Sequence, residues 1–242
     1  MRAAIMIKAA LFDVFGTCVD WRSGVTDFVR PFLLDRGLNS NLAEQIADDW
    51  RKLYDPSMER VRSGERPYVK LNIIQRENLD TVLDGIGIAP RFDDHARNQL
   101  NLAWEHLPAW SDTNDALMQL KNLMPIAACS NGSQSMMERL AAYADLPWSM
   151  ICGADTGQNF KPHPDVYLKS CQALRTEPAE TVMVACHADD LDAAAALGLR
   201  TAYFPRPREW GSVDFEPEPR SGRFDFTSAT FSTLITDIVK HR

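Results

Sequence analysis

Apolar residues follow two different spacings along the chain. Residues 5–12 form a short apolar run rich in Ala and Ile, and a Gly-Thr pair follows it after a few positions. This run is too short for a typical helix, so we predict a buried strand that ends in a loop. From about residue 25 to residue 104 the apolar positions recur at helical spacing, which predicts helices that start near Ser40 and Pro67. Two apolar faces carry this prediction: Leu42, Ile46, Trp50, Leu53 and Tyr54 on one, and Leu71, Ile74, Leu79, Val82, Leu83 and Ile86 on the other.

The second half of the chain alternates between short apolar runs and helical segments. Strands that alternate with helices through short links predict right-handed crossovers and a parallel sheet that is covered on both faces. Segment 205–223, rich in Pro, Arg and Glu, is typical of a long surface loop, and we expect a last strand and helix after it. The predicted strands are 125–129, 150–152, 181–186 and 201–204, and helices are predicted at 116–123 and 191–199.

These patterns together predict an α/β fold. Its core is a doubly wound (Rossmann-like) parallel sheet, and an all-helical cap domain is inserted into it. We place the core domain at residues 1–20 and 105–242 and the cap domain at residues 21–104. In open parallel sheets, ligands bind at the carboxyl ends of the strands, so functional residues are expected there.

Composition and charge narrow the class of partners. The chain of 242 residues has 45% hydrophobic and 24% charged residues, enough for a sizeable core. Its 26 Lys and Arg against 33 Asp and Glu give a net charge of −7, which argues against a nucleic-acid partner or an anionic membrane. Five cysteines without a CxxC pair indicate neither a disulfide framework nor a zinc site, so we expect a cytoplasmic protein. Charged residues interrupt the first apolar stretch, so neither a signal peptide nor a membrane helix is expected.

Four reactive side chains follow predicted strands or open the loops after them. They are Asp13, Ser130, Lys161 and Asp190. Each has an ordinary structural interpretation, such as a turn carboxylate for Asp13 or a helix cap for Asp190. Because one parallel sheet would gather all four at the same edge, the set together predicts an active site.

The segments that carry these side chains resemble a known enzyme group. The segments Asp13-Val14-Phe15-Gly16-Thr17, Cys129-Ser130-Asn131-Gly132, Phe160-Lys161-Pro162 and His187-Ala188-Asp189-Asp190 are similar to the four motifs of the haloacid dehalogenase superfamily. Most members of that group are magnesium phosphatases, with a second Asp two residues after the nucleophile and an Asp ligand at the fourth motif. Here Phe15 and Cys186 occupy those positions. The phenyl ring of Phe15 cannot donate a proton, and the neutral thiol of Cys186 is a poor ligand for magnesium.

Because a halide is a stable leaving group, the same Asp nucleophile can displace it without an acid or a metal. The variant residues therefore match the type II L-2-haloacid dehalogenases, and the resemblance implies short (S)-2-haloalkanoic acids as substrates, an aspartyl ester as intermediate, and neither metal nor other cofactor. A small-molecule partner and a possible homodimer follow from it as well. The implied catalytic residues are Asp13 as nucleophile, Thr17 at the oxyanion, Arg51 at the halide, Ser130 at the substrate carboxylate, Lys161 beside Asp13 and Asp190 at the water. The implied substrate-binding residues are Phe15, Asn131, Tyr167 and His187.

The fourth motif departs from the best-known dehalogenase pattern, Ser-Ser-Asn-x-Trp-Asp. In Ala185-Cys186-His187-Ala188-Asp189-Asp190 one hydroxyl, one amide and one aromatic wall are replaced, which leaves the substrate range open. His187 stands where that pattern has Asn, either as a polar contact in a subset that includes fluoroacetate-cleaving enzymes or as a residue that only binds backbone. Asp189, next to Asp190, leaves weak metal affinity open.

Three other functions stay open on the sequence alone. A magnesium phosphatase with an altered site is the first, and a hydrolase that uses the same ester route on another small carboxylate is the second. The third is a binding protein that has kept the fold without the chemistry.

Overall fold

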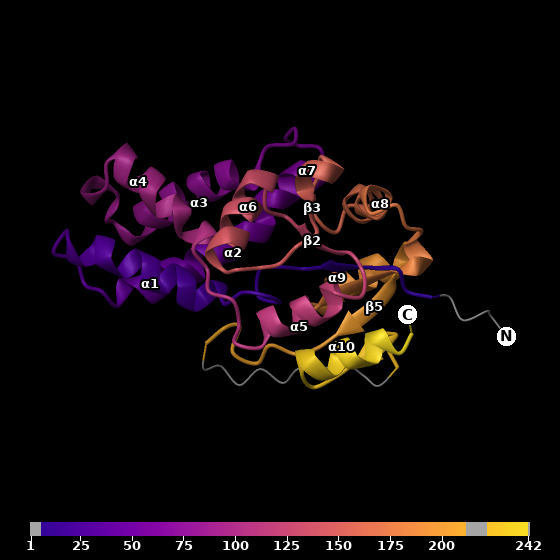
Figure 1. Ribbon diagram of the computed structural model, residues 1–242. Coiled ribbons are helices and arrows are strands. Elements are labelled where there is room, and N and C mark those ends of the chain that lie inside the picture. The colour runs from indigo at the N-terminus through magenta and orange to yellow at the C-terminus, as the bar shows by residue number, and fades with distance from the viewer. Residues whose placement is uncertain (1–5, 212–221, 242) are drawn as a thin grey trace.

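The computed structural model describes residues 6–211 and 222–241 and contains one six-stranded sheet. All its strand pairs are parallel, and the strand order is β3-β2-β1-β4-β5-β6. This confirms the predicted doubly wound parallel sheet (Figure 1). The strands are β1 (Ala9–Phe12), β2 (Ile126–Ser130), β3 (Met150–Gly153), β4 (Thr181–Ala185), β5 (Arg200–Tyr203) and β6 (Phe226–Thr227).

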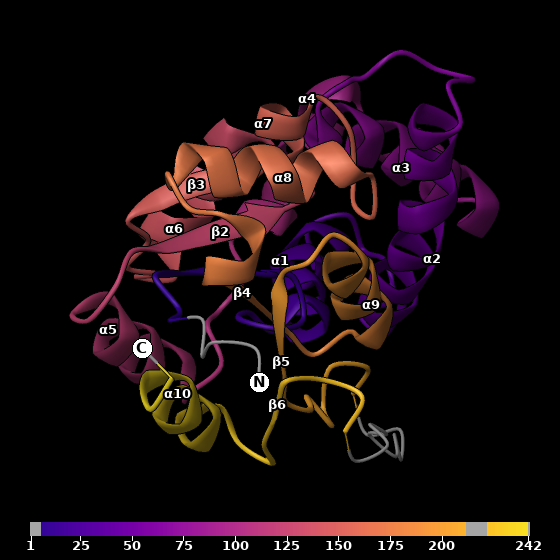
Figure 2. The same ribbon diagram turned by 90° about the vertical axis from the view of Figure 1, so that its right-hand side faces the viewer.

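Helices cover both faces of the sheet, because successive strand residues point to opposite sides. Ala10 and Phe12 enter one apolar cluster, whereas Leu11 between them enters a second cluster. In Figure 2, α5 and α10 lie to the lower left of the strands, whereas α8 and α9 lie on the upper right. The helices of the sheet region are α5 (Thr113–Lys121), α6 (Gln134–Tyr143), α7 (Ala154–Gly157), α8 (Pro164–Ala173), η3 (Pro178–Glu180), α9 (Ala188–Ala196) and α10 (Phe231–Val239).

The segment between β1 and β2 is helical, as predicted. Its first helix, α1, begins at Trp21 because the side chain of Asp20 accepts a hydrogen bond of 3.0 Å from the amide of Ser23. These helices pack on one another at one side of the sheet, on the left of Figure 1. They are α1 (Trp21–Leu34), α2 (Leu42–Arg62), α3 (Leu71–Ile86), η1 (Ala89–Arg91), α4 (Asp94–Asn101) and η2 (Leu102–Glu105).

The predicted surface loop at 205–223 is the part of the fold that needs correction. Glu209, within this segment, is only 5% exposed, and its carboxylate contacts Trp21 in the first helix and His187 just after β4. Residues 212–221 lie outside the described part of the chain. The described residues of the segment do form a loop, and strand β6 and helix α10 follow it, as predicted. The burial of Glu209 was not predicted, because a buried carboxylate with polar partners leaves no apolar pattern in the sequence.

The strand order places the site. The chain runs from β1 to β2 and β3 in one direction across the sheet and then returns to β4 on the other side of β1. The adjacent ends of β1 and β4 therefore form the switch point at which such sheets bind ligands. Among the helices of residues 6–211 and 222–241, none has the length and apolar character needed to cross a bilayer.

Candidate active site

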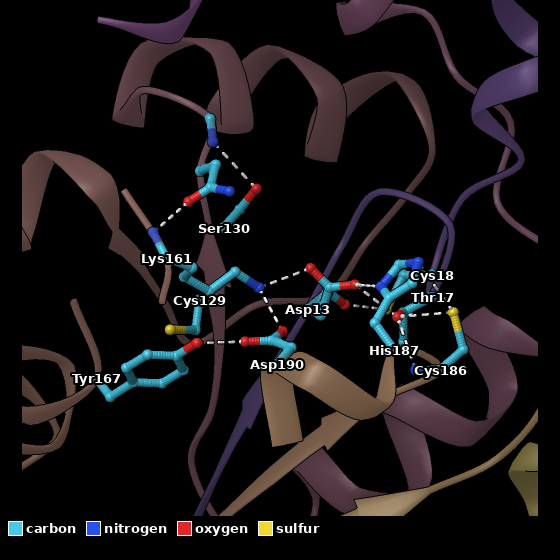
Figure 3. Close-up of polar contacts among 12 residues, drawn as sticks. Asp13, Thr17, Cys18, Cys129, Ser130, Lys161, Tyr167, Cys186, His187 and Asp190 are labelled. Carbon is cyan, nitrogen blue, oxygen red and sulfur yellow. Dashed lines mark hydrogen bonds and ion pairs between the residues drawn. The ribbon is translucent and has the colours of Figure 1, made fainter. Parts of the chain in front are cut away.

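Asp13 follows β1 directly and is buried. Its amide donates to the carbonyl oxygen of Val184, which extends the pairing of β1 with β4 by one residue. Thr17, four residues later in the loop, donates its hydroxyl hydrogen to Oδ2 of Asp13 at 2.7 Å (Figure 3). The amide of Cys186, at the end of β4, donates to Oγ1 of Thr17 at 3.1 Å. The two strand ends thus hold the predicted nucleophile from both sides.

Lys161 joins Asp13 to Asp190. Its Nζ lies 2.7 Å from Oδ1 of Asp13 and 2.6 Å from Oδ2 of Asp190, and all three side chains are buried. The hydroxyl of Tyr167 donates to the other oxygen of Asp190 at 2.5 Å, as Figure 3 shows. The structure therefore brings four predicted site residues from four segments into one chain of polar contacts.

These contacts shift the pKa values of the three charged groups. Burial alone would raise the pKa of Asp13, but the charge of Lys161 and the contact with His187 hold it well below the usual range. Burial opposes the charge on Lys161, yet the two carboxylates raise its pKa well above the usual value. For Asp190, burial and the charge of Asp13 outweigh Lys161, so its pKa is raised. Asp13 therefore stays ionised to a lower pH than Asp190 does, which suits a nucleophile.

His187 also contacts the nucleophile. Its Nδ1 lies 2.9 Å from Oδ2 of Asp13, and its Nε2 lies 3.0 Å and 3.1 Å from the two carboxylate oxygens of Glu209. The interpretation in which His187 only binds backbone is therefore wrong. Burial would lower the pKa of the ring, but the adjacent Cys186 sulfur, the charge of Glu209 and the hydrogen bond to Asp13 raise it well above the usual value. A ring between two carboxylates is an imidazolium that donates from both nitrogens.

Glu209 is a site residue that the sequence did not reveal. It reaches the site from the loop after β5, and the indole Nε1 of Trp21 donates to its Oε1 at 3.1 Å. Gly16, with φ +84°, makes room for it, because a Cβ at this position would collide with the Glu209 carboxylate. Segment 205–223 is rich in Pro, Arg and Glu, and this composition does not single out Glu209.

A cavity of about 200 Å³ opens beside Asp13. One wall is aromatic: Phe15 packs edge-on against Tyr54, with ring centroids 6.4 Å apart. The Arg51 guanidinium lies over the Tyr54 ring at 4.4 Å, and its buried Nε has no hydrogen-bond partner among the described residues. Arg51 as a whole is half-buried, and a cation with a buried donor left without a partner fits an anion site. The lining consists of Asp13, Phe15, Arg51, Tyr54, Asp55, Met58, Asn131, Lys161, Pro162, Tyr167, His187, Asp189 and Asp190.

Ser130 and Thr17 are the predicted site residues that do not line this cavity. Ser130 is fully buried, and its Oγ accepts a hydrogen bond of 3.1 Å from the amide of Gly132. Asn131 does line the cavity, and its Oδ1 accepts a hydrogen bond of 2.7 Å from the amide of Lys161. The structure thus places Asn131 at the cavity and Ser130 in the turn that positions it.

The donor groups at these strand ends do not suit magnesium. Oδ2 of Asp13 already accepts from Thr17 and His187, and burial raises the pKa of the Cys186 thiol, so this group stays neutral. Magnesium prefers charged oxygen ligands in octahedral geometry. Sγ of Cys186, Nε2 of His187 and a carboxylate oxygen of Glu209 lie within 4.8 Å of one another, but the ion pair between His187 and Glu209 accounts for this grouping.

Comparison with known proteins assigns the family. The model of the haloacid dehalogenase-like hydrolases matches residues 7–198. The chain belongs to this family. An (S)-2-haloacid dehalogenase of Xanthobacter autotrophicus is 31% identical over 204 residues, which cover 83% of this chain and 76% of that protein.

Two solved structures of L-2-haloacid dehalogenases are also similar to this haloacid dehalogenase-like hydrolase. One is described as defluorinating; it superposes with a TM-score of 0.92 at 37% identity and covers 96% of this chain and 95% of its own. The other has a TM-score of 0.87 at 35% identity and covers 96% of this chain and 99% of its own. The resemblance inferred from the four motifs is confirmed, whereas the roles of single residues and the domain boundaries stay predictions.

Proposed function

We propose that this protein is a hydrolase that converts short (S)-2-haloalkanoic acids, such as haloacetates and 2-chloropropionate, to 2-hydroxy acids through an ester on Asp13. Its relatives at 31%, 35% and 37% identity are all 2-haloacid dehalogenases. The observation that carries the proposal is the placement of Asp13. This carboxylate, kept ionised by Lys161, faces a cavity that Arg51 and the Phe15 ring both line, and Nε of Arg51 has no hydrogen-bond partner among the described residues.

The first step is a displacement at C2 of the substrate. One carboxylate oxygen of Asp13 forms a bond to C2 while the carbon–halogen bond breaks, and the halide leaves with the bonding electron pair. Attack in line with the leaving group inverts C2, so an (S)-haloacid gives an (R)-hydroxyacid. Arg51 supplies the positive charge for the halide, and Phe15 excludes water from it.

The second step is hydrolysis of the ester at Cγ of Asp13. We assign to Asp190 the positioning and activation of the water, because this carboxylate lines the cavity and Lys161 fixes it near Asp13. Its raised pKa makes it a stronger base than an ordinary Asp. Thr17 hydrogen-bonds to the oxygen that becomes negative. We propose that Asn131 and the turn formed by Ser130 bind the substrate carboxylate. Tyr167 orients Asp190 through its hydroxyl group.

The finer organisation of the protein is proposed on the same grounds. We propose that residues 21–104 act as a cap that brings Arg51 over the cavity and that residues 1–20 and 105–242 form the catalytic core. The five cysteines are free thiols, which fits the reducing cytoplasm. A homodimer is proposed from the family resemblance alone, and sedimentation of the purified protein tests it.

Halide release in the presence of EDTA tests the function. Each enantiomer of 2-chloropropionate is assayed alongside chloroacetate and fluoroacetate, since one relative is a defluorinating enzyme. Of the two 2-chloropropionate enantiomers, we expect only the S form to release halide, and we expect chloroacetate to release it as well. The folded Asp13→Asn variant should lose more than about 10³-fold of this activity. Full release by that variant would contradict the proposal.

The same assay separates the alternatives. A phosphatase would turn over members of a phosphate-ester panel only with added magnesium, and its activity would disappear in EDTA. A binding protein without chemistry would be stabilised against heat by small carboxylates but would never carry an ester on Asp13.

A further inference from the structure

The two oxygens of the Asp13 carboxylate have different surroundings. Oδ1 contacts Lys161, which it shares with Asp190. Oδ2 receives two hydrogen bonds, at 2.7 Å from the Thr17 hydroxyl and at 2.9 Å from Nδ1 of His187 (Figure 3). Two fixed donors on one oxygen are the arrangement that stabilises an oxyanion.

We propose that Oδ2 of Asp13 carries the negative charge during ester hydrolysis and that Glu209 is a positioning residue for this step, because it holds His187 as a donor to that oxygen. The inference rests on the proposed function and adds a residue and an oxygen assignment to it. Oδ1 is then the oxygen that attacks the substrate.

The contacts of Glu209 leave the imidazole ring little freedom. Both carboxylate oxygens of Glu209 face Nε2 of His187, and Trp21 donates to one of them. Glu209 in turn lies against Gly16, where there is no room for a side chain. The ring is therefore fixed at both nitrogens, by Glu209 at one and by Asp13 at the other. The charged or titratable groups around it are Asp13, Cys186, Tyr203, Glu209 and, through Glu209, Arg51.

The hydrolytic step balances with these groups. The water oxygen bonds to Cγ of the ester, its proton passes to Asp190, and the electron pair of the C=O double bond moves to Oδ2. When the double bond re-forms, the bond between Cγ and Oδ1 breaks. Oδ1 leaves with the product and becomes its 2-hydroxyl oxygen. The proton on Asp190 goes to that leaving oxygen, which gives the 2-hydroxy acid. The water oxygen then remains in the Asp13 carboxyl group, and the second water proton leaves to solvent, which regenerates the ionised carboxylate.

The test separates formation of the ester from its hydrolysis. We expect Glu209→Leu to release a burst of about one halide per active site and then to turn over at least about tenfold more slowly, with the ester on the Asp13 peptide visible by mass spectrometry after acid quench. Glu209→Gln keeps a hydrogen-bond partner for Nε2, so it should hydrolyse the ester faster than Glu209→Leu. Glu105→Leu, which removes a buried carboxylate bound to Arg139, is the matched control and should accumulate no ester.

A second variant shows whether Glu209 acts through His187. The Asn in His187→Asn can donate an amide hydrogen without help from Glu209, so adding Glu209→Leu to it should not slow ester hydrolysis further. An equal loss in both backgrounds, or slow halide release with no trapped ester, would overturn the inference. If the wild-type enzyme releases no halide from any substrate, the proposed function fails instead.

Discussion

Asp190 is held by two neighbours of different kinds, the Lys161 ammonium and the Tyr167 hydroxyl. The hydrogen bond from Tyr167 favours the ionised form of Asp190, against the burial that raises its pKa. We predict that Tyr167→Phe raises this pKa further. Because protonated Asp190 cannot accept a proton from water, activity should then be lost at a higher pH on the acid side. The measurement is the pH dependence of kcat for wild type and variant.

A second tyrosine provides the control for this prediction. Tyr68 also donates its hydroxyl to a carboxylate, Asp155, but neither residue lines the cavity. Tyr68→Phe should leave the acid limb of the profile where it is in the wild-type enzyme. A Tyr167→Phe profile that coincides with wild type would show that Asp190 does not titrate in the rate-limiting step.

The same residue scale shows what the sequence could predict about the site. Asp13, Lys161 and Asp190 were predictable because each follows an apolar run or opens the loop beside one, and a parallel sheet gathers such positions. Glu209 was not, because its segment joins the site only through contacts with Trp21, Gly16 and His187, which are distant in sequence.

At the scale of elements, the loop after β1 and the loop after β5 meet at Gly16. This residue combines φ +84° with a position where a Cβ would collide with Glu209. Gly37 also has a positive φ, of +64°, but open space around it. We predict that Gly16→Ala lowers the free energy of unfolding by at least about 1 kcal/mol more than Gly37→Ala, because only Gly16→Ala adds a collision to the backbone strain. Urea denaturation measures both, and equal losses would show that the loop moves away freely.

The elements themselves were predicted well where an apolar pattern defines them. The predicted strand 125–129 is observed at Ile126–Ser130, and the predicted strand 181–186 at Thr181–Ala185. Helix α2 begins at Leu42, two residues after the expected start at Ser40, because backbone geometry rather than apolarity sets the first turn. The described part of segment 205–223 departed from its prediction because its buried residue is polar.

At the scale of the whole molecule, the charged residues of the proposed active site form one connected group inside the protein. The charges in this group alternate between negative and positive, and each residue contacts the next in the order Asp190, Lys161, Asp13, His187 and Glu209. They come from both sides of the switch point, so the folded sheet is required to bring them together. Removing any one charge leaves its neighbours buried without compensation, which couples the chemistry of the site to the stability of the fold.

This coupling predicts how stability depends on pH. The pKa of His187 is raised in the folded protein, so its protonation stabilises the fold fully below the unfolded value of about 6.5, and this contribution is lost as pH rises through the folded pKa. We predict that the difference in unfolding free energy between wild type and His187→Gln is largest below pH 6.5 and shrinks above it. Urea titrations from pH 5 to 9 measure this difference. In a Glu209→Leu background the pH dependence should weaken, because one of the two carboxylates that hold the proton on His187 is absent; an unchanged dependence would mean that Glu209 does not hold it.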